Sequence, residues 1–239
     1  MKLIIIRHGD PDYSIDSLTE KGWREAELLS ERISRLDVKA FYCSPLGRAK
    51  DTASLTLKKM NRKAKTLNWL REFEGRVSIN GEKKRAWDRL PREWTDNDDY
   101  YCPDKWLKTD LMQSGTVEKE YKKLCRGVDK LLERYGYVHE GRIFKAVEPN
   151  HDTVVLFCHY GVECAILSHI FGCSPMVMWH NFVALPTSVT TLVTEEREKG
   201  TAIFRMQQFA DISHLYDAGE EPSFAARFCE CYTDDTRHD

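Results

Sequence analysis

A chain of 239 residues with 41% hydrophobic and 31% charged residues has the composition of a folded globular protein that can bury a sizeable core. Its formal net charge of −2, from 36 basic and 38 acidic residues, argues against a nucleic-acid partner held by bulk charge. No stretch approaches the roughly 20 apolar residues of a membrane span. The apolar run at residues 3–6 is too short for a secretory leader. We expect a cytoplasmic protein that binds neither membranes nor nucleic acid.

The eight cysteines are too few for a disulfide scaffold. Cys43 and Cys158 lie inside apolar runs, as small buried hydrophobic residues do. Cys229 and Cys231 have a C-x-C spacing, but no second pair at zinc-binding spacing lies near them. We therefore expect no metal site there and a reducing compartment for the protein.

The first 70 residues alternate between strand and helix patterns. Apolar residues recur at helical spacing after Thr19, which can cap that helix with its hydroxyl. Strands that alternate with helices predict a parallel sheet covered on both faces. The expected strands are residues 2–6, 38–44 and 64–70, and the expected helices are residues 17–36 and 45–60.

Residues 76–113 break this alternation. They show no clear apolar period, carry charges of both signs and contain five aromatic residues. Disordered segments are poor in aromatic residues, so we expect an ordered insertion of short helices and loops that acts as a lid segment.

The second half of the chain returns to regular patterns. Gly172 is placed to end the helix at residues 162–172, and the last two strands, separated by a charged turn, resemble a hairpin. We find no linker and expect one domain over residues 1–239 with the insertion at 76–113. The remaining expected elements are a helix at 115–137, a loop at 141–150, a strand at 152–158 and a hairpin at 188–196 and 202–210.

Two of the expected strands end in the same way, with a histidine followed closely by glycine. His8 follows the first strand, directly after Arg7, and His159 follows the strand at 152–158. Ligands of open α/β sheets bind beyond the carboxyl ends of the strands, so His8 and His159 converge if their strands are neighbours. A lone histidine is more often a packing residue, but two at equivalent strand ends favour a site.

Arg48 lies in the first turn of the helix that follows the second strand. A helix N-terminus attracts anions, and a guanidinium adds a bidentate donor for phosphate. The alternative is a solvated surface arginine, and the neighbouring strand ends favour the phosphate interpretation.

The segments LIIIRHG, SPLGRAKDTA, WLREFEG and VVLFCHYG, in this order, resemble the histidine phosphatase superfamily, in the branch that includes phosphoglycerate mutases. The resemblance covers roughly residues 1–75 and 150–195. It implies a three-layer α/β/α sandwich and a covalent phosphohistidine intermediate. It further implies that His8 is the nucleophile, with Arg7, Arg48 and His159 around the transferred phosphoryl group.

The chemistry of phosphoryl transfer agrees with these roles. A neutral imidazole is a competent nucleophile near pH 7, provided that its second nitrogen donates a hydrogen bond, for which a backbone carbonyl is the expected acceptor. Two arginines offset the charge of the phosphoryl oxygens, so we expect no metal ion and no cofactor. The family pattern Leu-x-Glu falls on Leu70 to Glu72, which makes Glu72 the expected general acid and base; Glu74 fits a surface ion pair better.

Three positions depart from the mutases: Pro11, Ser14 and Tyr160 replace a small residue, a phosphate-contacting asparagine and a glycine. We therefore expect a metal-independent phosphomonoester hydrolase that acts on a small-molecule phosphomonoester. Two alternatives stay open: a phosphoglycerate-type mutase, and a catalytically silent module that binds phosphorylated ligands. The sequence indicates no oligomeric state.

The insertion bears on the choice of substrate. Lys83, Lys84 and Arg85 can attract a second anionic group, and Trp87 can stack on a ring. The alternative is that the charges are solvated and the tryptophans pack the insertion onto the domain.

Overall fold

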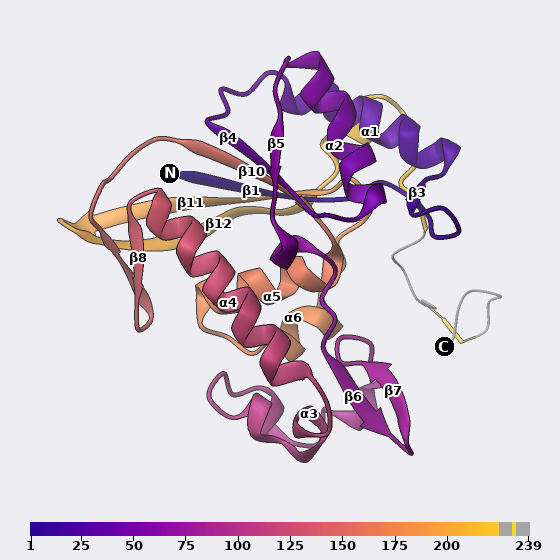
Figure 1. Cartoon of the computed structure of the whole chain (residues 1–239), viewed down its shortest axis with the longest axis vertical. Helices are drawn as coiled ribbons and strands as arrows, with labels where there is room; N and C mark the ends of the chain where they lie inside the picture. The colour runs from indigo at the N-terminus through magenta and orange to yellow at the C-terminus, as the bar shows by residue number, and fades with distance from the viewer. Residues whose placement is uncertain (225–230, 233–239) are drawn as a thin grey trace.

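The computed structural model describes residues 1–224 and 231–232; of the two cysteines in the C-x-C pair, Cys229 lies outside the described residues. Eight strands form one sheet in the order β5-β4-β10-β1-β11-β12-β9-β8 (Figure 1). They are β1 (Lys2–Arg7), β4 (Ala40–Cys43), β5 (Ala64–Thr66), β8 (Tyr137–Glu140), β9 (Ile143–Ala146), β10 (Thr153–Cys158), β11 (Val189–Glu198) and β12 (Thr201–Asp211).

Strand direction in this sheet is mostly parallel, as predicted. Strands β1, β10, β4 and β5 pair in parallel with one another, and β1 lies beside β10 as the converging histidines require. Strands β11 and β9 are antiparallel to both of their neighbours, so six of the eight strands run in one direction. The carboxyl ends of β1, β10 and β4 therefore share one edge of the sheet.

Helices cover both faces of the sheet and complete three layers (Figure 1). One face is covered by α1 and α2, and the other by α4, α5 and α6. The main helices are α1 (Glu20–Ile33), α2 (Gly47–Lys59), α4 (Val117–Arg134), α5 (Tyr160–Phe171) and α6 (Pro175–Asn181), with short helices α3 (Asp110–Gln113) and α7 (Ser213–Tyr216).

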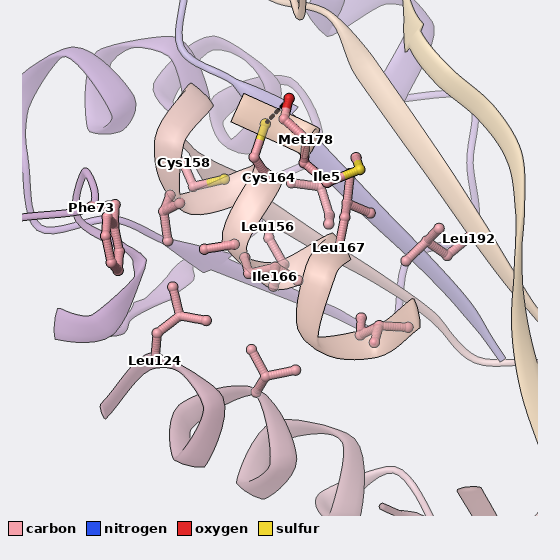
Figure 2. Packing of buried hydrophobic residues seen from close by; sticks show 14 of the residues in the cluster. Ile5, Phe73, Leu124, Leu156, Cys158, Cys164, Ile166, Leu167, Met178 and Leu192 are labelled. Atoms are coloured by element: carbon pink, nitrogen blue, oxygen red, sulfur yellow. Dashed lines mark hydrogen bonds between the residues drawn. The ribbon is translucent and has the colours of Figure 1, made fainter. Parts of the chain in front are cut away.

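The apolar run of β1 contributes side chains to two hydrophobic cores, one on each face of the sheet. Successive side chains of a strand point to opposite faces. Ile4 and Ile6 accordingly join the core under α1 and α2, whereas Leu3 and Ile5 join the core on the side of α4 and α5. Figure 2 shows this second core, in which Ile5 of β1 lies near the side chains of α5. A strand buried on both faces holds its terminal residues in a fixed position.

The predicted helix ends are confirmed at two places. The Thr19 side chain accepts a hydrogen bond from the backbone N–H of Gly22 and so caps α1. Gly172 ends α5 with φ +63°, a left-handed conformation that glycine adopts at low cost.

The prediction of short helices and loops is wrong for the start of the insertion. Residues 76–85 form a hairpin of β6 (Arg76–Ile79) and β7 (Glu82–Arg85), and the small strands β2 (Pro11–Asp12) and β3 (Ser17–Leu18) were also not expected. Asn80 and Gly81 both have positive φ, +51° and +82°, as a two-residue hairpin turn requires. Asn-Gly between two short strands was the available signal.

The expected loop at 141–150 is likewise wrong at its beginning. Strands β8 and β9 pair as a hairpin around Gly141, which has φ +66°. This hairpin forms the edge of the sheet opposite to β5.

The rest of the insertion consists of short helical turns that pack on the domain. Trp94 and Trp106 are buried, and the Trp106 ring contacts that of Trp179 on α6 at a centroid distance of 5.9 Å. These two tryptophans therefore attach the insertion to the fold. The turns are Pro91–Glu93, Asp98–Tyr100 and Trp106–Lys108, and a similar turn at Asn68–Leu70 replaces the end of the strand expected at 64–70. Among the described residues, no helix has the length and apolarity to span a bilayer.

Candidate active site

His8 follows β1 directly and is almost completely buried. Its Nδ1 lies 2.7 Å from the carbonyl oxygen of Gly9, an atom that can only accept a hydrogen bond. The proton must therefore be on Nδ1, which leaves a lone pair on Nε2. This is the arrangement that the sequence predicted for a nucleophilic imidazole.

His159 follows β10 and occupies the N-cap position of α5. Its ring centroid is 5.0 Å from that of His8, so the two strand ends converge as expected. The Ser44 hydroxyl at the end of β4 lies 2.7 Å from Nε2 of His159. Nδ1 of His159 is buried and has no hydrogen-bond partner among the described residues. A polar atom buried in this way is available to a ligand.

Arg7, the last residue of β1, is held beside this pair. Its Nη1 donates to the carbonyl oxygen of Ala184 at 2.6 Å, and its guanidinium carbon lies 5.8 Å from the ring centroid of Tyr160. Nε of Arg7 is buried without a partner among the described residues. Tyr160, which departs from the mutase pattern, donates its hydroxyl hydrogen to backbone carbonyls of residues 179 and 182 and thereby ties α5 to α6.

Arg48 reaches the pair from the first turn of α2. Its Nε is 3.4 Å from Nε2 of His8, and its Nη1 donates to Asp16 at 2.6 Å. Asp16 also accepts from the backbone N–H of Gly47 at the start of α2 and is itself in the left-handed region, with φ +50°. The guanidinium therefore already has one carboxylate partner.

Glu72 lies at the N-terminus of α5. Its Oε1 accepts hydrogen bonds from the backbone N–H groups of Phe73, at 2.7 Å, and Val162, at 3.0 Å. A Cβ on Gly161 would come within 2.7 Å of this Oε1 and 3.0 Å of Nε1 of Trp87. The glycine after Tyr160 thus permits the carboxylate and the indole to approach the helix end.

Burial and neighbouring positive charge both lower the pKa of the two imidazoles. The pKa of His8 lies well below its ordinary value because the ring is desolvated and faces the cations Arg7 and Arg48. The pKa of His159 is lowered for the same reasons, with desolvation again the largest cause. Both rings are therefore neutral near pH 7, and a bound dianion beside His159 would favour protonation of that ring.

Sequence reasoning missed three residues of this site. Ser44 belongs to the quoted SPLGRAKDTA segment, so the motif could have indicated it. Asp16 carried no signal, because only the fold places it on Arg48. Glu163 of α5 is completely buried, accepts a hydrogen bond from Thr190 at 2.6 Å, and burial raises its pKa to about 7. Its Oε2 has no partner among the described residues.

The structure also shows the contacts of Ser14 and of the charged and aromatic residues of the insertion. Ser14 forms a turn in which its backbone N–H and its hydroxyl both donate to Asp12. In the insertion, Arg85 stacks on Trp87 at 5.0 Å, and the Trp87 ring meets the ring of Tyr160 edge-on at 6.3 Å. Lys84 pairs with Glu82 at 3.4 Å. The insertion therefore borders the site through Trp87 and Arg85.

Two arginines, two neutral imidazoles and a carboxylate at a helix N-terminus define a site suited to phosphoryl transfer on an α/β/α fold. The chain belongs to branch 1 of the histidine phosphatase superfamily, whose sequence pattern matches residues 3–206.

Known proteins of this fold include enzymes that act on several phosphorylated compounds. Over 69 residues, the chain is 38% identical to a 2,3-bisphosphoglycerate-dependent phosphoglycerate mutase of Thermoplasma acidophilum, a match to 25% of this chain and 34% of that enzyme. The chain thus matches about a third of the length of this relative.

Solved structures resemble the chain over nearly its whole length. A mutant phosphoserine phosphatase of Entamoeba histolytica in complex with phosphoserine has a TM-score of 0.59 at 19% identity and covers 90% of this chain and 98% of its own. A mycobacterial glucosyl-3-phosphoglycerate phosphatase has a TM-score of 0.58 at 18% identity and covers 87% and 98%. At these identities the likeness establishes the fold.

Proposed function

We propose that this protein is a phosphomonoester hydrolase that forms a covalent phosphohistidine on His8 and needs no metal ion for this step. The observation that carries the proposal is the hydrogen bond from Nδ1 of His8 to the Gly9 carbonyl, which leaves Nε2 unprotonated beside Arg48. An imidazole held in this tautomer is a ready nucleophile, and the neighbouring guanidinium is placed to neutralise a phosphate oxygen.

In the first step, Nε2 of His8 attacks phosphorus and the bond to the leaving oxygen breaks. Arg7, Arg48 and His159 stabilise the charge on the phosphoryl oxygens, while Glu72 donates a proton to the leaving oxygen. Both hydrogen bonds that the described residues give Glu72 fall on Oε1, so Oε2 is the atom left to carry this proton. In the second step Glu72 takes a proton from water, the hydroxide oxygen bonds to phosphorus, and the P–N bond breaks to restore His8.

The test is hydrolysis of p-nitrophenyl phosphate in the presence of a chelator by the wild type and by His8→Ala. We expect activity in the wild type and a loss of at least about 10³-fold in the variant, because alanine cannot form the phosphohistidine intermediate. His151→Ala, which changes an exposed histidine, serves as the matched control. Equal rates in the wild type and His8→Ala would show that His8 is not the nucleophile.

A phosphoglycerate-type mutase is the second candidate, supported by the local similarity to the Thermoplasma enzyme. A mutase must retain the phosphoryl group and return it to the substrate, whereas a hydrolase passes it to water. Incubation with 3-phosphoglycerate separates them: we expect release of inorganic phosphate, and conversion to 2-phosphoglycerate without release would favour the mutase. A protein that binds vanadate but performs neither reaction would be the silent binding module.

The substrate is proposed to be a small phosphorylated metabolite whose remainder lies against Trp87 and Arg85. This follows from the contact of Trp87 with Tyr160 and from the stacking of Arg85 on Trp87. A panel of metabolite phosphates assayed with the wild type and Arg85→Ala tests it, with the largest loss expected for substrates that carry a second anionic group. Equal losses for all substrates would contradict a role in specificity.

A further inference from the structure

Three potential metal ligands from three elements meet away from the catalytic histidines. They are Asp129 on α4, His139 on β8 and His169 on α5. Oδ1 of Asp129 is 2.6 Å from Nε2 of His169 and 3.0 Å from Nδ1 of His139, and the two ring nitrogens are 3.3 Å apart. Three atoms that can each offer a lone pair therefore point at one small volume.

These distances suit a bound ion. Zinc binds imidazole nitrogen and carboxylate oxygen at about 2.0–2.2 Å, which places neighbouring atoms of a tetrahedral ligand set about 3.3 Å apart. The pair at 3.3 Å has this spacing, the pair at 3.0 Å is about 0.3 Å short of it, and the pair at 2.6 Å has to widen by about 0.7 Å. A set of two imidazoles and one carboxylate is the chemistry that zinc and neighbouring divalent transition metals prefer.

The surroundings hold these ligands in place and leave access for an ion. The His139 ring stacks on Phe144 of β9 at 4.5 Å with 14° between the planes, which fixes its orientation. Both imidazole side chains are 16% exposed and the carboxylate is 39% exposed, so solvent can supply the ion and a water as the fourth ligand.

The charge environment also favours a cation. His169 lies in the last turn of α5, where the helix dipole carries its negative end, and Asp129 adds a full negative charge. The site is distinct from the catalytic centre because His159 and His169 are separated by ten residues of α5, a rise of about 15 Å.

We propose that Asp129, His139 and His169 form a binding site for one divalent transition-metal ion, with zinc as the best-fitting ion, which ties α4 and α5 to the edge strand β8. The sequence predicts no metal, from the isolated Cys229 and Cys231 pair and from the two arginines beside the phosphoryl group; Asp129, His139 and His169 are far apart in the chain, and the fold brings them together. The hydrogen-bonded cluster without an ion, in which Asp129 accepts from both rings, is the competing interpretation.

The test is titration of chelator-treated protein with Zn²⁺ by calorimetry, and with Co²⁺ by visible absorption. We expect one ion per chain, d–d bands of a low-symmetry site without thiolate charge-transfer bands, and at least about 100-fold weaker binding for His139→Ala and His169→Ala. An ion concentration of about 100 times Kd should raise Tm by about 5–10 °C in the wild type.

Two control variants separate this site from other histidines. His151→Ala changes an exposed histidine outside the cluster, and His8→Ala changes the catalytic centre; both should bind the ion as the wild type does. Asp129→Asn, checked for folding by circular dichroism, replaces either alanine variant that does not fold, and it should weaken binding as well. Absence of stoichiometric binding, or binding that survives all three cluster substitutions, would overturn the proposal and leave a hydrogen-bonded cluster.

Discussion

Helix α5 has a histidine at each end, and the two ends have opposite surroundings. At the N-terminus, His159 lies 5.0 Å from His8, between ring centroids, and both face Arg7 and Arg48. At the C-terminus, His169 lies 4.7 Å from His139, and both contact Asp129. The imidazole pairs have nearly the same spacing, yet one is surrounded by cations and the other contacts an anion.

Neighbouring charge thus decides which ligands a pair of histidines favours. The N-terminus of a helix carries a partial positive charge and the C-terminus a partial negative one. Arginines at the first end extend the positive potential toward an anionic phosphate, and the aspartate at the second extends the negative potential toward a cation.

Replacing Glu72 by Gln should have the largest effect on substrates with poor leaving groups. We expect the hydrolysis rate of an alkyl phosphate to fall by about 10²–10⁴-fold, because the alkoxide needs a proton, and that of p-nitrophenyl phosphate to fall much less. Steady-state rates on both substrates measure the difference. Glu74→Gln is the matched control, since Glu74 pairs with Arg71 on the surface. Equal losses on both substrates would count against an acid role.

Removing Arg48, a cation beside His8 and His159, should lower activity by nearly as much. Arg48→Ala is expected to lower kcat/KM by about 10²–10³-fold, the usual loss for one donor to a charged transition state. Arg62→Ala provides the comparison, because Arg62 stacks on Phe41 and donates to backbone carbonyls away from the histidines. If both variants stayed within a few-fold of the wild type, the cationic surroundings would not be what distinguishes this end of α5.

The buried Glu163, near the N-terminus of α5, makes folding stability depend on pH. Burial raises its pKa from 4.5 to about 7, so its protonated form stabilises the fold at low pH, and this contribution is lost as the pH rises through about 7. The difference between a pKa of 4.5 and one of about 7 corresponds to about 3 kcal/mol of folding free energy. Glu163→Gln cannot ionise, so its stability relative to the wild type should increase by about 3 kcal/mol between pH 4 and pH 8.

Urea unfolding at several pH values measures this difference, and the exposed Glu133→Gln should show none of it. A constant difference between Glu163→Gln and the wild type across the range would mean that Glu163 ionises as freely in the folded protein as in the unfolded chain.

The smallest expected effect concerns Asp16, the carboxylate that pairs with Arg48. Asp16→Asn should keep the hydrogen bond to Gly47 but remove the negative charge from Arg48. We expect the inhibition constant of vanadate for p-nitrophenyl phosphate hydrolysis to fall about two- to fivefold. The effect is small because Asp16 is 45% exposed and solvent screens its charge. Asp12→Asn, whose carboxylate accepts from Ser14 instead, should leave inhibition unchanged. Weaker inhibition in Asp16→Asn would mean that the pair orients Arg48 for the ligand.

Much of the fold was predictable because its signals are local. The apolar run of β1, the Thr19 cap and the Gly172 terminus depend on residues within one or two turns. The Asn80-Gly81 turn is an equally local signal, but it lies among charged residues that show no clear apolar period. The opposite holds near Trp69, where a helical turn replaces the end of the expected strand. The Trp69 ring packs against Gly127 of α4, and this packing outweighs a weak local preference.

Local sequence was enough to place each reactive group on its element: His8, His159 and Arg48 follow strand ends, and a parallel sheet brings such ends together. The charges that face these groups come from distant parts of the chain and depend on the folded arrangement. Asp16 pairs with Arg48, Glu163 is buried within the electrostatic reach of Arg7, and Asp129 contacts two histidines that are 30 residues apart in the chain. Electrostatic energy depends on distance in space and on burial, and neither is encoded by sequence separation.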